Sequence, residues 1–232
     1  MIDSYDVCRP GRVRPVNQDR AGCFTWGDWC LGFVADGMGG HYGGEQASEI
    51  VAQACSQWWD SFLNAPQRPS FLQSVEQLRR LLYQCHEKIA EITPPHTACG
   101  TTAVLLWVCG REYALFSVGD SRCYKVAYRF GLAQKPVQLT HDDVSGEPHL
   151  AGKLTRALGP GTCAFSLKTG QVRCGTVFAL CSDGIYKACP GLMQELRRIS
   201  GKIPLERAAD RITAQVDEYG APDNYSLVLL RV

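Results

Sequence analysis

The chain has 232 residues, of which 45% are hydrophobic and 20% are charged. This composition is typical of a folded globular protein and is too rich in apolar residues for an intrinsically disordered chain. The 24 lysines and arginines nearly balance the 23 aspartates and glutamates, no basic cluster stands out, and no apolar run reaches the ~20 residues of a membrane-spanning helix. We therefore expect neither a nucleic-acid-binding protein nor a membrane protein.

The first residues contain no cationic segment followed by an apolar stretch, which is the pattern of a secretory signal, so we expect a cytoplasmic protein. The 12 cysteines are scattered, form no Cys-x-x-Cys pair and mostly lie within apolar stretches. Buried free thiols are a better interpretation of this pattern than disulfides or a zinc site.

Two segments rich in aromatic and apolar residues, 20–26 and 29–35, flank the dipeptide Gly27-Asp28, which is typical of a two-residue hairpin turn. They are predicted to pair as antiparallel strands, and this turn places Asp19 directly opposite Asp36. Two like charges at opposed positions destabilise a strand pair unless something neutralises them. Either a divalent cation binds there, or the register slips at the strand end and both aspartates are solvated.

Farther along the chain, apolar residues at helical spacing predict a long helix that begins after Gly43 and ends before Asn64. A second helix begins after Ser70, where Gln73 completes a capping-box pattern, and it ends before Pro94.

The remaining elements follow from apolar runs bounded by turn residues. Strands are predicted at 101–109, 112–118 and 122–127, which we interpret as a meander, and at 177–181 and 225–232. Helices are predicted at 192–199 and 204–219. No repeat or long linker divides the chain, so residues 1–232 are expected to form a single α+β domain with helices covering its sheets.

Aspartates recur at the ends of the predicted strands. Asp36 and Asp183 each follow an apolar strand and precede a glycine, Asp120 lies in a turn between two strands, and Asp223 lies in the Asp223-Asn224 pair just before the last strand. Each alone would be an ordinary turn residue. Together with Asp19 they suggest a site for a hard divalent cation, Mg²⁺ or Mn²⁺, because carboxylate oxygens and few histidines favour these ions over zinc.

Eight short motifs in this order resemble the metal-dependent (PPM, phosphatase 2C type) serine/threonine protein phosphatases, and the Asp-Gly-Met-Gly-Gly form resembles the bacterial branch. The motifs are Arg14-Pro15-Val16-Asn17-Gln18-Asp19, Val34-Ala35-Asp36-Gly37-Met38-Gly39-Gly40-His41, Gly44-Glu45-Gln46-Ala47-Ser48, Gly100-Thr101-Thr102, Val118-Gly119-Asp120-Ser121-Arg122, Leu154-Thr155-Arg156-Ala157-Leu158-Gly159, Cys181-Ser182-Asp183-Gly184 and Asp223-Asn224-Tyr225-Ser226. Any one of them would be a weak signal, but the ordered series spans nearly the whole chain.

The resemblance implies a four-layer α-β-β-α sandwich, in which helix pairs flank two antiparallel sheets and a binuclear Mn²⁺/Mg²⁺ centre lies at one edge. By the resemblance, Asp36 would bridge two ions, and the Gly37 carbonyl with Asp19, Asp183 and Asp223 would complete the ligand set. Asp120, with Asp183, would match the position of a third, weaker ion. Arg14 would bind the substrate phosphate.

The function implied by the resemblance is hydrolysis of phosphoserine and phosphothreonine by a metal-activated water, with Arg14, Asp36 and Asp183 as catalytic residues. The substrate would be a phosphorylated protein, the product of a serine/threonine kinase, and we expect the enzyme to be a monomer. The alternative is a pseudophosphatase that keeps the fold as a binding or regulatory module. A partner-switching phosphatase is a weaker interpretation, because such sequences generally lack the arginine that matches Arg14.

Three features depart from the family pattern. Gln18 stands where an acidic residue is common before Asp19, and Met38 stands where eukaryotic members carry a histidine, so the general acid is unassigned. His41 is nearby, and we interpret it as a loop or helix-start residue. The flap is reduced to residues 143–153, whose Ser145-Gly146-Glu147-Pro148 run predicts a turn beside an open groove.

Overall fold

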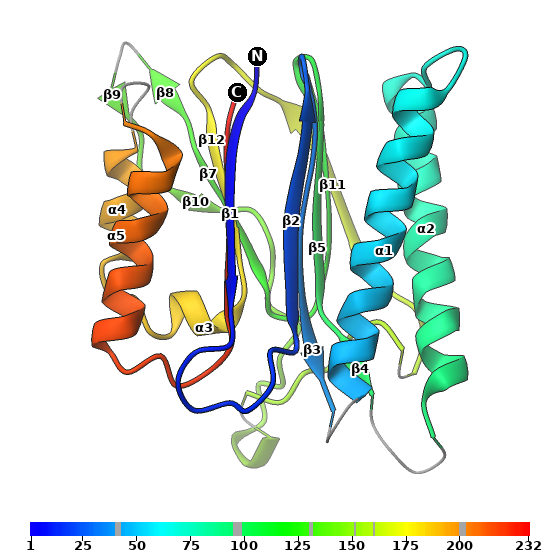
Figure 1. The fold of residues 1–232 in the computed structure, drawn as a ribbon, viewed down its shortest axis with the longest axis vertical. Helices are drawn as coiled ribbons and strands as arrows, with labels where there is room; N and C mark the ends of the chain where they lie inside the picture. Colours follow the sequence, from blue (N-terminus) through cyan, green and yellow to red (C-terminus); the bar gives the residue numbers. More distant parts are fainter. Residues whose placement is uncertain (40–42, 95–98, 130–131, 151, 160, 200–202) are drawn as a thin grey trace.

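The computed structural model describes residues 1–39, 43–94, 99–129, 132–150, 152–159, 161–199 and 203–232. It has four layers, and Figure 1 shows two β-sheets side by side with helices on both outer faces. One outer layer consists of α1 (Gly43–Asn64) and α2 (Phe71–Ile92), and the other contains α4 (Leu192–Arg198) and α5 (Leu205–Glu218). The predicted α-β-β-α sandwich is confirmed.

Each sheet contains strands from distant parts of the chain, and every pairing is antiparallel. The first sheet has the order β1 (Asp3–Arg9), β13 (Tyr225–Arg231), β12 (Val177–Cys181), β7 (Arg122–Val126) and β10 (Val137–Gln138). The second has the order β11 (Ser166–Gln171), β6 (Glu112–Val118), β5 (Ala103–Cys109), β3 (Trp29–Met38) and β2 (Asp19–Trp26), with the short β4 (Gly100–Thr101) beside β3. Two further short strands, β8 (Tyr128–Arg129) and β9 (Leu132–Ala133), pair with each other.

The first hairpin has the predicted register. Trp26 pairs with Trp29 across the turn, and Asp19 pairs with Asp36 at the other end of the two strands. The alternative, a register slip that separates the two aspartates, is therefore wrong. The second helix also begins as predicted, since the Ser70 side chain accepts from the Gln73 backbone and the Gln73 side chain accepts from the Ser70 backbone.

The predicted meander is only partly correct. β5 and β6 are neighbours, but β7 lies in the other sheet between β12 and β10. The chain crosses between the sheets at Gly119, which has φ +91°, and a Cβ there would lie 2.6 Å from the Thr102 side chain. Only glycine fits a backbone of this shape against Thr102, so the turn redirects the chain instead of closing a hairpin.

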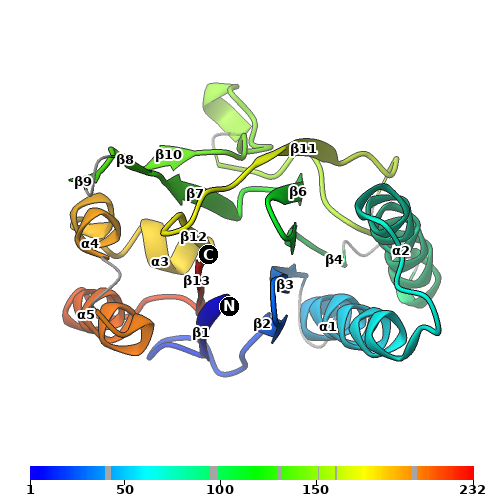
Figure 2. The same ribbon diagram turned by 90° about the horizontal axis from the view of Figure 1, so that it is seen from above.

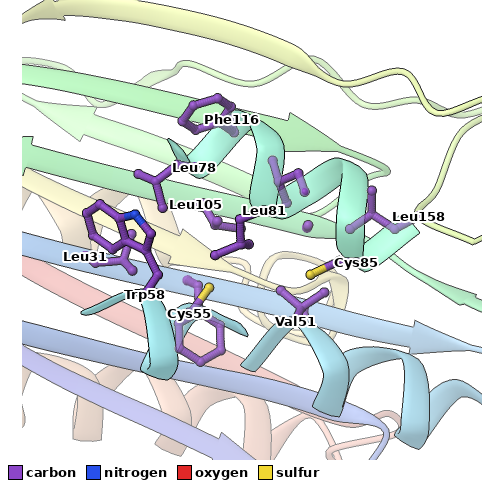
Figure 3. Packing of buried hydrophobic residues seen from close by; sticks show 14 of the residues in the cluster. Leu31, Val51, Cys55, Trp58, Leu78, Leu81, Cys85, Leu105, Phe116 and Leu158 are labelled. Carbon is purple, nitrogen blue, oxygen red and sulfur yellow. The ribbon is translucent and has the colours of Figure 1, made fainter. Parts of the chain in front are cut away.

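Three buried clusters hold the layers together. One fills the space between the β2/β3/β5/β6 sheet and the helices α1 and α2, where Trp58 and Leu78 meet Leu105 (Figure 3). A second lies between the two sheets and includes Val104, Phe178 and Val228. The third lies between the other sheet and its helices, including α3 (Asp183–Tyr186), which Figure 2 shows between α4 and the sheets.

Several smaller expectations can also be compared with the structure. All 12 cysteines are free, as predicted, but only seven of them are buried, and Cys174 is exposed. Within the described part of the chain, no helix is both long and apolar enough to cross a membrane. The sequence patterns missed the edge strands β1, β10 and β11, and the segment expected to be a turn contains a short 3₁₀ helix at Pro148–Leu150.

Candidate active site

A cavity of about 310 Å³ lies at the edge of the sandwich where the ends of several strands meet. Its charged lining residues come from the β1–β2 loop (Arg14), the end of β3 (Asp36), the β6–β7 turn (Asp120), α3 and the residue after it (Asp183 and Lys187), and the turn before β13 (Asp223). The fold thus brings together aspartates that lie up to 187 residues apart in the chain, 36 and 223 being the outermost.

Asp19 lies opposite Asp36 in the first hairpin and is 1% exposed. Its Oδ2 accepts hydrogen bonds from the Ser182 hydroxyl at 2.7 Å and the Ser226 hydroxyl at 2.8 Å. Its Oδ1 is also buried but has no hydrogen-bond partner in the described part of the chain. A buried carboxylate oxygen without a partner is costly, so this oxygen is a candidate ligand for a cation.

The crowding of these carboxylates shifts their ionisation. Burial, followed by the charges of Asp19, Asp183, Asp120 and Asp223, raises the pKa of Asp36 well above its ordinary range. Burial likewise raises the pKa of Asp19 to about 6, against the opposing effect of its two serine hydrogen bonds. Burial and the Asp183 charge also raise the pKa of Asp120. The site therefore has an excess of negative charge that a divalent cation would relieve.

Two side-chain cations partly offset this charge. Arg14 binds Asp223 with two parallel hydrogen bonds, Nε to Oδ1 at 2.8 Å and Nη2 to Oδ2 at 2.9 Å. Lys187 Nζ donates to Asp183 Oδ2 at 2.6 Å. With the side chains in these positions, no three acidic, histidine or cysteine groups in the described ranges are arranged to enclose a metal ion. For these carboxylates to enclose an ion, side chains of the site would have to move locally.

The chemistry of the site nevertheless fits Mn²⁺ or Mg²⁺. Asp19 offers an unpartnered oxygen, and no described residue donates a hydrogen bond to the Asp36 carboxylate. The candidate metal ligands are all hard oxygen atoms, and no histidine lines the cavity among the described residues.

Two glycines make close backbone approaches beside the aspartates that precede them. A Cβ on Gly37 would lie 2.1 Å from the Gly44 carbonyl oxygen at the start of α1. A Cβ on Gly184 would lie 2.0 Å from the Asn224 carbonyl oxygen just before β13. The Asp-Gly pairs thus place each carboxylate at a point where two elements touch through their main chains, and any side chain at the glycine would separate them.

Asn224 is a site residue to which the sequence analysis gave no role. Its Nδ2 donates to the carbonyl oxygens of Pro10 at 2.8 Å and Val16 at 3.0 Å, and its Oδ1 accepts from the Gln18 backbone at 2.9 Å. These three bonds fasten the loop that carries Arg14 to the turn that carries Asp223. In the sequence, the signal that could have pointed to this role was its position in the Asp223-Asn224 motif.

Asp143 is a second residue without a predicted role. It is 6% exposed, its Oδ2 accepts from the Gly119 backbone at 3.0 Å, and its Oδ1 accepts from Arg156. These bonds connect the short flap to the turn that carries Asp120. The flap also borders the site directly, since Gly152 and Leu154 line the cavity.

The departures from the family pattern lie mostly at the cavity. Gln18 and Met38 both line it, and Gln18 Nε2 donates to the Gly39 carbonyl oxygen at 3.3 Å. His41 lies outside the described residues. The general acid therefore remains unassigned.

Comparison with known proteins gives the same family. The family model of protein phosphatase 2C matches residues 12–225. A serine/threonine phosphatase, stp, of Listeria innocua is 28% identical over 95% of this chain and 92% of its own length.

Solved structures agree with this match. PppA, described as a key regulatory component of T6SS in Pseudomonas aeruginosa, has a TM-score of 0.78 and 27% identity, with 99% of this chain and 97% of that chain covered. The catalytic domain of the serine/threonine protein phosphatase PstP, solved in complex with two manganese ions, has a TM-score of 0.78 and 26% identity over the same shares of the two chains. From the match over residues 12–225 and these relatives, the chain is a member of the protein phosphatase 2C family and a protein serine/threonine phosphatase of the bacterial branch.

Proposed function

We propose that the protein hydrolyses phosphoserine and phosphothreonine in proteins, using a water molecule activated by two Mn²⁺ or Mg²⁺ ions. The observation that carries this proposal is the convergence of Asp36, Asp183 and Asp223 on one cavity, with Asp19 paired opposite Asp36 and one buried Asp19 oxygen without a partner among the described residues. The PstP catalytic domain, which was solved with two manganese ions, supports it.

Asp36 is the proposed bridging ligand, and Asp19, Asp183, Asp223 and the Gly37 carbonyl are the other protein ligands. The ions would supply a hydroxide at neutral pH and electrostatic stabilisation of the phosphoryl oxygens. The Ser182 and Ser226 hydroxyls hold one oxygen of Asp19 and would leave the other available to a cation.

Arg14 is the proposed phosphate-binding residue. Its guanidinium is half-exposed at the cavity, and its planar fork already binds one pair of oxygens, those of Asp223. A phosphate presents a similar pair. If Asp223 bound a metal ion, its carboxylate would hold the guanidinium less tightly, and Arg14 would be available to the substrate.

The substrate that fits this site is a phosphorylated protein made by a serine/threonine kinase. The lining is mainly polar and charged, so the site is suited to the phosphate rather than to an apolar part of the substrate. We retain as predictions that the protein acts as a cytoplasmic monomer and that residues 1–232 form one domain.

The competing function is that of a pseudophosphatase, a binding module with the same fold. Degenerate members of an enzyme family usually lose metal ligands, and this chain keeps every carboxylate of the proposed set, which favours activity. Hydrolysis of p-nitrophenyl phosphate with Mn²⁺, with Mg²⁺ and with EDTA separates the two. We expect turnover with at least one metal and none in EDTA, whereas no turnover under any of these conditions would favour the pseudophosphatase.

A further inference from the structure

The two cations at the site bind their aspartates in different ways. Arg14 uses both carboxylate oxygens of Asp223. Lys187 binds only Oδ2 of Asp183, and Oδ1 of Asp183 accepts no hydrogen bond from the described residues. Both oxygens of Asp223 are therefore already engaged, and its Oδ1 also accepts from the Asn224 backbone at 2.9 Å. Asp183 can offer Oδ1 to an ion while Lys187 stays where it is.

Lys187 is held in place by the local fold. It follows α3 directly, and its backbone N–H donates to the Asp183 carbonyl oxygen at 2.9 Å. This turn brings the two side chains, four positions apart, onto the same face. Burial lowers the pKa of the Lys187 ammonium group, but the hydrogen bond to Asp183 and the charges of Asp183, Asp120 and Asp36 outweigh it and raise the pKa above its ordinary value. Lys187, Asp183 and Asp120 all line the same cavity, and Lys187 Nζ contacts Asp183 directly.

Asp120 is also bound by the protein on this side. The Tyr186 hydroxyl donates to Asp120 Oδ2 at 3.3 Å, and the Arg122 guanidinium lies 3.6 Å from the centre of the Tyr186 ring. Arg122 is in turn fixed by Asp142, with Nη2 to Oδ2 at 2.6 Å. Tyr186 thus binds the Asp120 carboxylate, and its neighbour Lys187 binds the Asp183 carboxylate.

We propose that Lys187 is a resident cation that replaces a third metal ion between Asp183 and Asp120, so that the protein binds two ions and not three. This inference rests on the proposed binuclear function. An ammonium group supplies positive charge at that place, and a dication beside it would be repelled. It revises the expectation that Asp120 and Asp183 bind a third ion.

The test is the number of Mn²⁺ ions bound per chain at millimolar Mn²⁺, measured by equilibrium dialysis and by electron paramagnetic resonance of the free ion. We expect two ions for the wild type and three for Lys187→Ala. The double variant Lys187→Ala/Asp120→Asn should return to two ions, because it removes the carboxylate on which a third ion depends.

Two controls identify the charge of Lys187 as the cause. Lys187→Arg keeps a cation at this place and should bind two ions. Lys88→Ala removes one positive charge from α2, which contributes no residue to the cavity, and should also bind two ions. Because the Lys187 side chain is 60% exposed, we expect Lys187→Ala to keep the wild-type melting temperature.

The possible failures are distinguishable. Three ions in the wild type, or two in Lys187→Ala, would overturn the role of Lys187 while leaving the two-metal function intact. A wild-type protein that binds no Mn²⁺ and hydrolyses no phosphopeptide would overturn both proposals.

Discussion

Asp36 shows how a single residue can oppose folding and still be kept for chemistry. Its carboxylate is partly buried at the cavity, and burial together with the charges of the other site aspartates raises its pKa well above the ordinary value. A carboxyl group whose pKa is raised on folding favours the folded state while it is protonated, and that contribution is lost as the pH rises through its range. At neutral pH without metal, ionising Asp36 therefore costs free energy, because it adds a negative charge to a site that already holds several.

We predict that Asp36→Asn stabilises the metal-free protein at pH 7 by about 1 to 3 kcal/mol, because the neutral amide removes the repulsion at similar volume. The same change should abolish hydrolysis and most of the stabilisation by Mn²⁺. Urea unfolding in EDTA and in Mn²⁺ measures both effects, with Asp60→Asn on the exposed face of α1 as the control. A less stable Asp36→Asn in EDTA would contradict this view of the site.

Arg14 should behave differently, because it binds the substrate and not the ions. We predict that Arg14→Ala lowers kcat/KM by ~10²-fold or more through loss of a charge-assisted contact with phosphate. Mn²⁺ affinity should be unchanged or higher, since Arg14 no longer competes for Asp223. Kinetics equal to those of the wild type would mean that Arg14 does not contact the substrate.

At the scale of elements, the site depends on contacts that leave no space for a side chain. We predict that Gly37→Ala destabilises the protein by about 3 kcal/mol or more, because its Cβ would meet the Gly44 main chain at the start of α1. Gly146→Ala in the flap is the matched control, since its Cβ would have no neighbour within 4 Å. Equal denaturation midpoints for the two variants would contradict the close approach of β3 and α1.

How well the elements could be predicted depended on how much apolar surface each one buries. The hairpin with Gly27-Asp28, the capped α2 and the apolar strand β12 follow from periodicity and turn chemistry, and their predictions are confirmed. β11 is mostly exposed, so it lacks the alternation by which an edge strand could be found. The sheet to which β7 belongs is decided by a tertiary contact between Gly119 and Thr102, which local sequence does not encode.

The same limit applies to the site. Each aspartate could be located at a strand end, but the roles of Asn224 and Asp143 arise from loops that meet only in the fold. The pairing of Asp183 with Lys187 follows from a turn of helix too short to predict from periodicity. The ligand set, by contrast, came largely from the family resemblance.

At the scale of the whole molecule, the cluster between the two sheets should couple the two halves into one folding unit. Its residues come from both sheets, as Val104 on β5 and Phe178 on β12 illustrate. The two halves therefore cannot separate without exposing a buried apolar core to water.

We predict a single cooperative unfolding transition, and the positions of the tryptophans allow a clear test. All 5 tryptophans lie on β2, β3, α1 and β5, in the same half of the sandwich. Tryptophan fluorescence therefore reports that half, whereas far-UV circular dichroism reports both. The two urea curves should coincide in EDTA and shift together in Mn²⁺. Separate transitions would show that the halves unfold independently and would contradict the single-domain prediction.

The central claim concerns the molecule as a phosphatase, and one measurement tests it directly. Phosphate release from a phosphothreonine peptide is followed for the wild type and for Asp36→Asn, each in Mn²⁺ and in EDTA. We expect release only from the wild type in Mn²⁺, with a loss of at least ~10³-fold in the other three conditions. Equal rates in Mn²⁺ and EDTA, or a fully active Asp36→Asn, would contradict hydrolysis by a metal-activated water.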